Sequence, residues 1–282
     1  MMHTVKKLID DALAEDIGSG DITTDNLVAP DQTGHAVILA KEPMVLAGLE
    51  IAIQVFETLD PSLAMESRYT DGDQLAAGDR VMALTGRLRP LLHGERTALN
   101  FLQRMSGIAT HVSAYAAAVK DYPVRLVDTR KTTPGWRVLE KYAVRIGGAA
   151  NHRMGLYDGV LIKDNHIAAC GGITTAVTRV RANTSHLVKI EVEVGTLDEV
   201  AEALSAGADV IMLDNMDLEQ IRAAVAAIDQ RAVVEISGNV SLEKLPELAR
   251  TGVDIISVGA LTHQAQSVDI SMRIKTGEAT AA

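Results

Sequence analysis

Six short apolar runs, separated by helical patterns, occupy the chain from residue 124 onward and constrain its fold more than any other feature. The last four runs begin roughly 22 residues apart, the length of one strand–helix unit. The expected strands are Val124–Thr129, Val160–Lys163, Val188–Val194, Val210–Asp214, Val233–Ser237 and Ile255–Val258. This alternation predicts a parallel sheet, in a barrel-like or a doubly wound arrangement. Because no glycine-rich dinucleotide turn follows any of the strands, the barrel is favoured.

The first third of the chain has a different pattern. Val5–Ala14 has the spacing of an amphipathic helix, and Gly48–Leu59 is the helical pattern among several short strands. Those strands are expected at Ala36–Ala40, Met44–Ala47, Leu63–Tyr69 and Arg80–Leu84. A long helix is expected over Leu91–Lys120, with Gly107 as its break. Together these elements predict an α+β module with an antiparallel sheet.

We therefore expect a protein of the α/β class with two domains. The first domain is placed at residues 1–107 and the barrel domain at residues 108–265. The tail, residues 266–282, is a candidate to pack back on the first domain.

Positive charge is concentrated between Arg125 and His166. This segment holds eight Lys and Arg residues against four Asp and Glu, whereas the whole chain has a formal net charge of −10. The acidic remainder would repel a long polyanion, so a nucleic-acid partner is not expected. A small, multiply charged anion fits the local excess better, with a solvated basic surface as the alternative.

Composition narrows the cellular setting. The single cysteine, Cys170, excludes an internal disulfide and suits a reducing compartment. Two glycines follow it, which indicates a turn. Cys170 is therefore expected to be a small residue of that turn rather than a nucleophile. Residues 1–15 have no long apolar core, and no apolar run approaches ~18 residues. We expect no secretory signal, no membrane partner and a cytoplasmic location.

Ionisable residues recur near the carboxyl ends of the predicted strands. Lys163, Glu193 and Asp214 are examples, and Glu191 shares the strand face of Glu193. A charge in that position must be paired or face a ligand, because burying it alone is costly. Active sites of barrels form at this end of the sheet. An internal lattice of ion pairs is the alternative, and Lys189 is its best candidate member.

Each charge sign suits a different ligand. Arg130, Lys131, Arg153 and Lys163 suit carboxylates and phosphates, while Glu193 and Asp214 suit sugar hydroxyls or the waters of Mg²⁺. Small residues after the last two strands suit a phosphate cradle made of backbone N–H groups. They are Ser237, Gly238, Asn239, Val258, Gly259 and Ala260.

Several motifs in one order carry a resemblance to a known family. They include Glu95–Asn100, Asp128–Gly135, Glu140–Arg145, Asn151–Arg153, Leu161–Ile167, Glu191–Val194, Leu213–Asn215 and Ser257–His263. The chain closely resembles quinolinate phosphoribosyltransferases over nearly its whole length. The resemblance implies an N-terminal α/β sandwich domain and a C-terminal open, incomplete TIM-like α/β barrel. It also implies a pentosyltransferase that makes nicotinate mononucleotide, CO₂ and pyrophosphate from quinolinate and phosphoribosyl pyrophosphate, for NAD biosynthesis.

The resemblance also implies roles for individual residues. Quinolinate would be surrounded by Arg130, His152, Arg153 and Lys163, with Arg96 supplied across the interface of a homodimer. Thr129 is a further substrate-binding residue. Phosphoribosyl pyrophosphate would meet the remaining set: Lys131, Glu193, Asp214, Ser237, Gly238, Asn239, Val258, Gly259, Ala260 and His263. Catalysis is assigned to Lys131, Lys163, Glu193 and Asp214. No direct metal ligand is assigned; the expected cofactor, Mg²⁺, would be held by Glu193 and Asp214 through water.

Two other functions stay open on the sequence. One is a paralogous phosphoribosyltransferase-like protein with a different substrate, and the other is a non-catalytic anion-binding protein. Asn239 stands where the family usually has glycine, which puts the fine geometry of the phosphate loop in question.

Overall fold

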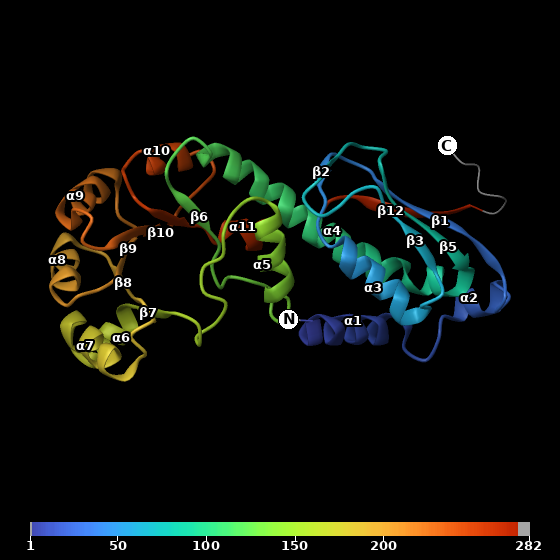
Figure 1. Ribbon diagram of the computed structural model, residues 1–282, viewed down its shortest axis with the longest axis horizontal. Coiled ribbons are helices and arrows are strands. Elements are labelled where there is room, and N and C mark those ends of the chain that lie inside the picture. Colours follow the sequence, from blue (N-terminus) through green and yellow to red (C-terminus); the bar gives the residue numbers. More distant parts are fainter. Residues whose placement is uncertain (1, 276–282) are drawn as a thin grey trace. The chain divides into compact units, whose positions relative to one another are not determined.

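The computed structural model describes residues 2–275, and the chain forms two compact units in it (Figure 1). The first unit comprises Met1–Ser113, Thr133–Gly148 and Gln264–Ala282, and the second comprises Ala114–Thr132 and Ala149–His263. The expected division after residue 107 therefore differs from these units, because a segment from the middle of the chain packs with the N-terminal part. No helix in residues 2–275 is both long enough and apolar enough to cross a membrane.

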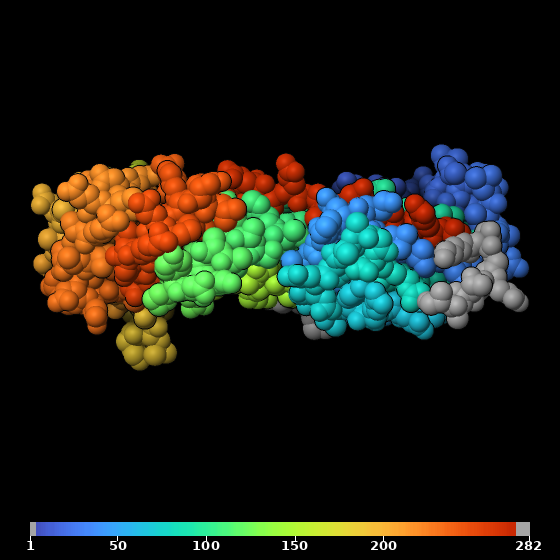
Figure 2. All heavy atoms as spheres, turned by 90° about the horizontal axis from the view of Figure 1, so that it is seen from above, coloured from blue at the N-terminus to red at the C-terminus, as the bar shows by residue number. Residues whose placement is uncertain are grey.

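The first unit combines helices with a small antiparallel sheet. Its elements are α1 (Met2–Ile17), α2 (Ile22–Leu27), β1 (Thr33–Ala40), β2 (Met44–Val45), α3 (Leu49–Leu59), β3 (Ala64–Glu66), β4 (Gln74–Leu75), β5 (Arg80–Arg87), most of α4 (Leu88–Val119), α5 (Arg137–Ile146) and β12 (Ile270–Lys275). The strand order is β12-β1-β5-β3, with β2 and β4 forming a separate pair. In Figure 2 the segment around residues 60–85, in cyan, lies on the visible surface of this unit.

The described part of the tail returns to this sheet. β12 pairs antiparallel with β1, and Ile38 lies opposite Met272. The side-chain amide of Gln103 donates to the carbonyl of Ile270 over 3.0 Å, which fixes the start of this strand against α4. Residues 276–282 of the expected tail lie outside the described residues.

The expected break of the long helix at Gly107 is wrong, because α4 runs without interruption through this position. A Cβ atom at residue 107 would clash with the backbone carbonyl of Gln266 and lie 2.9 Å from the Cα of Ser267. The glycine is needed so that the returning backbone can approach the helix closely. Sequence spacing alone predicts that such a glycine interrupts the helix.

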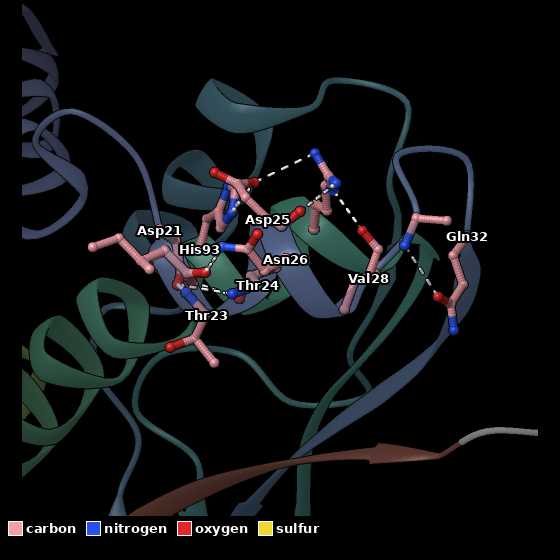
Figure 3. A network of polar contacts seen from close by, with 11 residues as sticks. Asp21, Thr23, Thr24, Asp25, Asn26, Val28, Gln32 and His93 are labelled. Carbon is pink, nitrogen blue, oxygen red and sulfur yellow. Dashed lines mark hydrogen bonds and ion pairs between the residues drawn. The ribbon is translucent and has the colours of Figure 1, made fainter.

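A short helix, α2, was not predicted, although its cap is visible in the sequence. The Asp21 carboxylate accepts hydrogen bonds from the backbone N–H groups of Thr23 and Thr24, at 2.9 and 3.0 Å. Figure 3 shows this cap beside Asp25 and His93, which lie 3.5 Å apart between carboxylate and imidazole. A side-chain acceptor before the first turn is the usual start signal of a helix.

The second unit is an open parallel sheet covered by helices. It holds β6 (Arg125–Val127), β7 (Val160–Ile162), α6 (Asp164–Cys170), α7 (Ile173–Asn183), β8 (Ile190–Val194), α8 (Leu197–Ser205), β9 (Val210–Asp214), α9 (Leu218–Ile228), β10 (Val233–Ser237), α10 (Leu245–Ala249), β11 (Ile255–Ser257) and α11 (Ala260–His263). All six predicted strands are present. The strand order β6-β11-β10-β9-β8-β7 leaves β6 and β7 as the two ends, so the barrel is incomplete, as expected.

Alternation along the strands separates a helix-packed face from a polar face. Val192, Ile211 and Leu213 are fully buried. Glu191 and Glu193 occupy the alternate positions of β8, so they point to the other side of the sheet. Figure 1 shows α7, α8 and α9 succeeding one another along this sheet. The polar face is therefore the one that remains for a ligand.

Candidate active site

Charged and polar side chains lie at the carboxyl ends of four neighbouring strands. Lys163 directly follows β7, Glu193 lies near the end of β8, Asp214 ends β9 and Ser237 ends β10. The parallel register brings these ends level, and Ser237 lies directly opposite Asp214. The sheet therefore gathers at one edge four residues that the sequence analysis had placed in the site.

The Lys163 ammonium group contacts the Glu193 carboxylate at this edge. The lysine backbone N–H donates to Nδ1 of His166 over 2.9 Å, which closes the first turn of α6. His166 therefore caps the helix α6, whereas its position past the strand end had suggested a loop cap. The lysine stem is held at a strand-to-helix junction, so its charge has a defined position.

Asp128 holds the Asn151–Arg153 segment in place. It lies directly after β6 and is fully buried. Its two carboxylate oxygens accept hydrogen bonds from the Asn151 side chain, at 2.7 Å, and from the His152 backbone N–H, at 2.9 Å. The sequence analysis noticed Asp128 but gave it no role. Its geometry makes it a support for the Asn151–Arg153 segment.

The imidazole of His152 lies between two buried carboxylates. Its Nε2 is 3.2 Å from Glu191 Oε2 and 3.5 Å from Glu235 Oε1. Burial opposes the charged form, but hydrogen bonds to Glu191 and Glu235 outweigh it and raise the pKa of His152 to about 9. Burial also raises the pKa of the Glu191 carboxyl. The protonation of His152 is therefore coupled to that of Glu191 in a low-dielectric interior.

This cluster has the donor types and spacing of a metal site, since its three groups lie within 4.8 Å of one another. The hydrogen bonding argues for a different use. The backbone N–H of Arg153 donates to Nδ1 of His152 over 2.8 Å. The neutral ring that accepts this bond carries its hydrogen on Nε2, and the protonated ring, in which this bond is lost, carries one there too. In both forms Nε2 faces the carboxylates as a donor and offers no lone pair to a metal. We assign the cluster to orienting His152.

Arg130 and Arg153 lie close enough to affect one another. Burial and the charge of Arg130 both lower the pKa of Arg153. The Arg153 guanidinium donates to the carbonyl of Gly159 over 3.0 Å. Two like charges are brought together at a cost that a bound anion would offset. A cavity of about 410 Å³ adjoins Arg153 and His152 and reaches the start of β8.

A third group of residues meets after β6 and β11. A Cβ atom at Gly259 would lie 2.8 Å from the Lys131 side chain and 3.3 Å from Nε2 of His263. The Thr262 hydroxyl donates to the Lys131 carbonyl over 2.7 Å. The lysine, the glycine and the histidine therefore lie together, and the small residue leaves room between the two larger side chains.

The structure does not bring every predicted residue to this edge. Arg96 is exposed on α4 in the first unit. Lys189, the expected internal ion-pair partner, is exposed and precedes β8, so that expectation is wrong. Cys170 ends helix α6 rather than lying in a turn. Trp136, the single tryptophan, stacks on Phe101 with ring centroids 4.9 Å apart, so it packs against helix α4.

Two residues of the cluster were visible in the sequence as ionisable strand residues but were not among the expected site residues. Glu191 and Glu235 orient His152, and their signal was present as a period of two, since they share strand faces with Glu193 and Ser237. A larger cavity of about 650 Å³ lies in the first unit, beside α1, α3 and α5. Its walls are mainly apolar and lack the strand-end charges, so we place the candidate active site in the second unit.

Comparison with known proteins agrees with this architecture. Residues 21–106 match the model of the quinolinate phosphoribosyl transferase N-terminal domain, and residues 108–273 match that of the C-terminal domain. Probable nicotinate-nucleotide pyrophosphorylases (carboxylating) of Bacillus subtilis and Synechocystis are 45% and 48% identical to this chain. The alignments cover 96% and 93% of this chain, and 93% and 90% of the relatives.

Solved structures show the same fold over the full length. NadC from Streptococcus pyogenes superposes with a TM-score of 0.94 at 41% identity, covering 98% of both chains. The nicotinate-nucleotide pyrophosphorylase from Francisella tularensis gives a TM-score of 0.92 at 41% identity, covering 97% of this chain and 96% of that one. The chain belongs to the quinolinate phosphoribosyl transferase family.

Proposed function

We propose that this chain transfers the phosphoribosyl group of phosphoribosyl pyrophosphate to quinolinate and releases CO₂. The products are nicotinate mononucleotide and pyrophosphate, which makes the reaction a step of NAD biosynthesis. Family membership over both domains and relatives named carboxylating pyrophosphorylases support this. The observation that most supports the proposal is that four polar or charged residues lie at the ends of four neighbouring strands: Lys163, Glu193, Asp214 and Ser237.

Quinolinate carries two adjacent carboxylates and therefore needs several fixed cations. Arg130 and Arg153 lie near one another, and His152 is held beside Arg153 by their shared hydrogen bond. With Thr129 and Lys163, they are the proposed quinolinate-binding residues. Arginine binds carboxylates through two parallel hydrogen bonds, and lysine acts as a point charge.

The sugar donor needs a neutralised diphosphate and an anchored ribose. Lys131 and His263 provide cationic or donor groups beside Gly259. Glu193 and Asp214 provide acceptors for ribose hydroxyls. The proposed backbone cradle follows the last two strands: Ser237, Gly238, Asn239, Val258, Gly259 and Ala260.

Mg²⁺ is the proposed cofactor, because it prefers oxygen ligands and commonly bridges protein carboxylates and substrate phosphates while keeping several waters. Glu193 and Asp214 fit such a role, since both carboxylates lie at the same edge of the sheet. When bound, the ion would neutralise the diphosphate leaving group. These two residues would hold it through water.

The expected chemistry needs little from the protein beyond positioning and charge. Displacement at the anomeric carbon develops positive charge on the ribose, which Glu193 and Asp214 stabilise. The pyridine nitrogen becomes a cation when the new bond forms. That cation accepts the electron pair left by the departing CO₂, and the ring carbon then takes up a proton. We expect no covalent intermediate with the enzyme.

We further propose a homodimer in which Arg96 reaches the active site of the partner subunit. The support is the resemblance to the family together with the exposure of Arg96 in the first unit. The cytoplasmic location stays a prediction that rests on the single cysteine, Cys170.

The reaction is tested by measuring CO₂ release from quinolinate labelled in its 2-carboxylate, with phosphoribosyl pyrophosphate and Mg²⁺. Nicotinate is run in parallel, with pyrophosphate release as the readout. Quinolinate-dependent CO₂ and nicotinate mononucleotide are expected. Turnover of nicotinate alone would indicate another substrate, and tight quinolinate binding without turnover would indicate an anion-binding protein.

A further inference from the structure

Two asparagines in left-handed backbone conformations follow the neighbouring strands β9 and β10. The φ angles of Asn215 and Asn239 are 55° and 51°. Among residues 2–275, the other non-glycine residues with positive φ are Asp229 and Gln230, at the turn after α9. This conformation costs free energy for any residue with a Cβ atom, and such strain gathers at functional sites. Asn215 directly follows Asp214, and Asn239 lies two residues after Ser237.

The side chains of these asparagines form a relay that ends on Asp214. The amide nitrogen of Asn239 donates to Oδ1 of Asn215 over 2.9 Å. The amide nitrogen of Asn215 donates to Oδ2 of Asp214 over 2.6 Å. A carboxylate only accepts, so the orientation of the Asn215 amide is fixed, and its oxygen must face the next donor. The hydrogen bonds of the relay therefore all donate in one direction, from Asn239 through Asn215 to Asp214.

The neighbouring glycine is shaped to this relay. A Cβ atom at Gly238 would clash with Oδ1 of Asn215 and lie 3.1 Å from Oδ1 of Asp214. The backbone N–H of Asn215 also donates to the Ser237 carbonyl over 3.2 Å. These contacts connect the ends of β9 and β10 around the carboxylate of Asp214. Asn239, the departure from the family pattern, contributes a side chain that a glycine could not.

We propose that Asn215 and Asn239 are positioning residues for Asp214 in the reaction proposed above. They engage Oδ2 of the carboxylate, which leaves Oδ1 to face the sugar donor and its Mg²⁺. The side chain of Asn239 acts only through Asn215, since it touches the relay at Oδ1 of that residue. The inference rests on the proposed function and assigns two residues to the binding of phosphoribosyl pyrophosphate.

The experiment uses glycine substitutions, because glycine adopts positive φ without strain and so removes only the side chain. Asn215→Gly, Asn239→Gly and the double variant are assayed with each substrate varied in turn. Asn215→Gly is expected to raise KM for phosphoribosyl pyrophosphate about tenfold, the size of a hydrogen bond to a charged group. KM for quinolinate is expected to change less than about twofold, because its proposed contacts are elsewhere.

The double variant tests the direction of the relay. Because Asn239 works through Asn215, the double variant should be no worse than Asn215→Gly alone. Gln230→Gly is the matched control, since it relieves a φ of 59° outside the site and should leave both KM values unchanged. Thermal melts of all variants show whether the fold is retained.

Two results would overturn the assignment while leaving the proposed function intact. One is an active wild type with an unchanged KM for phosphoribosyl pyrophosphate in Asn215→Gly. The other is a double variant whose defect equals the product of the single defects. An inactive wild type would refute the proposed function and this role with it.

Discussion

The backbone N–H of Arg153 donates to Nδ1 of His152 over 2.8 Å, while the opposite ring nitrogen faces Glu191 at 3.2 Å. The imidazole is thus fixed from both sides by groups that lie far apart in sequence. Its protonation state is coupled to the fold of the barrel, and the following predictions begin from that coupling.

Stability is expected to fall as the pH rises from about 6.5 to 9. Hydrogen bonds to Glu191 and Glu235 raise the pKa of His152 against burial, from 6.5 to about 9 in the folded state, so their contribution is complete below the unfolded value and is lost as the pH passes the folded one. The hydrogen bond from the Arg153 N–H forms only with the neutral ring, so it offsets part of this loss. The raised pKa of Glu191 acts in the same direction. Melting temperatures of wild type and His152→Gln across this range test it. A wild-type slope that persists in His152→Gln would contradict the assignment.

Arg130→Ala is expected to lower kcat/KM by about a hundredfold or more with no loss of melting temperature. Its side chain is exposed, and a bound carboxylate would lose a bidentate ion pair on its removal. Arg125→Ala is the matched control, since it is an exposed arginine at the start of β6, the strand that precedes Arg130. Equal activity of both variants would place the substrate elsewhere.

Asp128→Ala is expected to destabilise the protein by about 2–5 kcal/mol, because it leaves the Asn151 amide and the His152 N–H without their buried acceptor. Urea unfolding measures the change. Asp164→Ala, an exposed aspartate at the start of α6, serves as the comparison. A loss below about 1 kcal/mol in Asp128→Ala would show that solvent reaches these donors.

Gly107→Ala is expected to destabilise the fold by about 1–3 kcal/mol, although alanine favours helices. The added methyl group would collide with the backbone of Gln266 and Ser267. Asn100→Ala, at an exposed position of the same helix, should be neutral or stabilising. If both substitutions stabilise the protein in urea unfolding, the close approach of the tail is not present in solution.

Mixing Arg96→Ala with Lys163→Ala subunits should restore about a quarter of wild-type activity after exchange. Each heterodimer would then contain one intact site, and half of the dimers would be mixed. Each variant alone should be nearly inactive and dimeric by light scattering. Should the refolded mixture stay as inactive as its components, Arg96 does not act across an interface.

Local patterns in the sequence determined the elements of this protein and the types of its site residues. The six parallel strands followed from apolar runs at regular spacing, and Lys163, Glu193 and Asp214 were identifiable because they come at strand ends. The family motifs supplied the reaction. None of these inferences needs to know which strands are neighbours.

Tertiary structure alone decided the pairings. His152 meets Glu191 and Glu235, residues 39 and 83 positions further along the chain, because the strand order brings loop and strands together. The sequence alone predicts that Gly107 breaks the helix, and only the structure shows the tail backbone packed beside it. The sequence alone places Asn215 and Asn239 in separate loops, and only the pairing of β9 with β10 shows that the two loops are neighbours. Periodicity reports which face a residue occupies, whereas contacts between distant segments depend on how those faces are assembled.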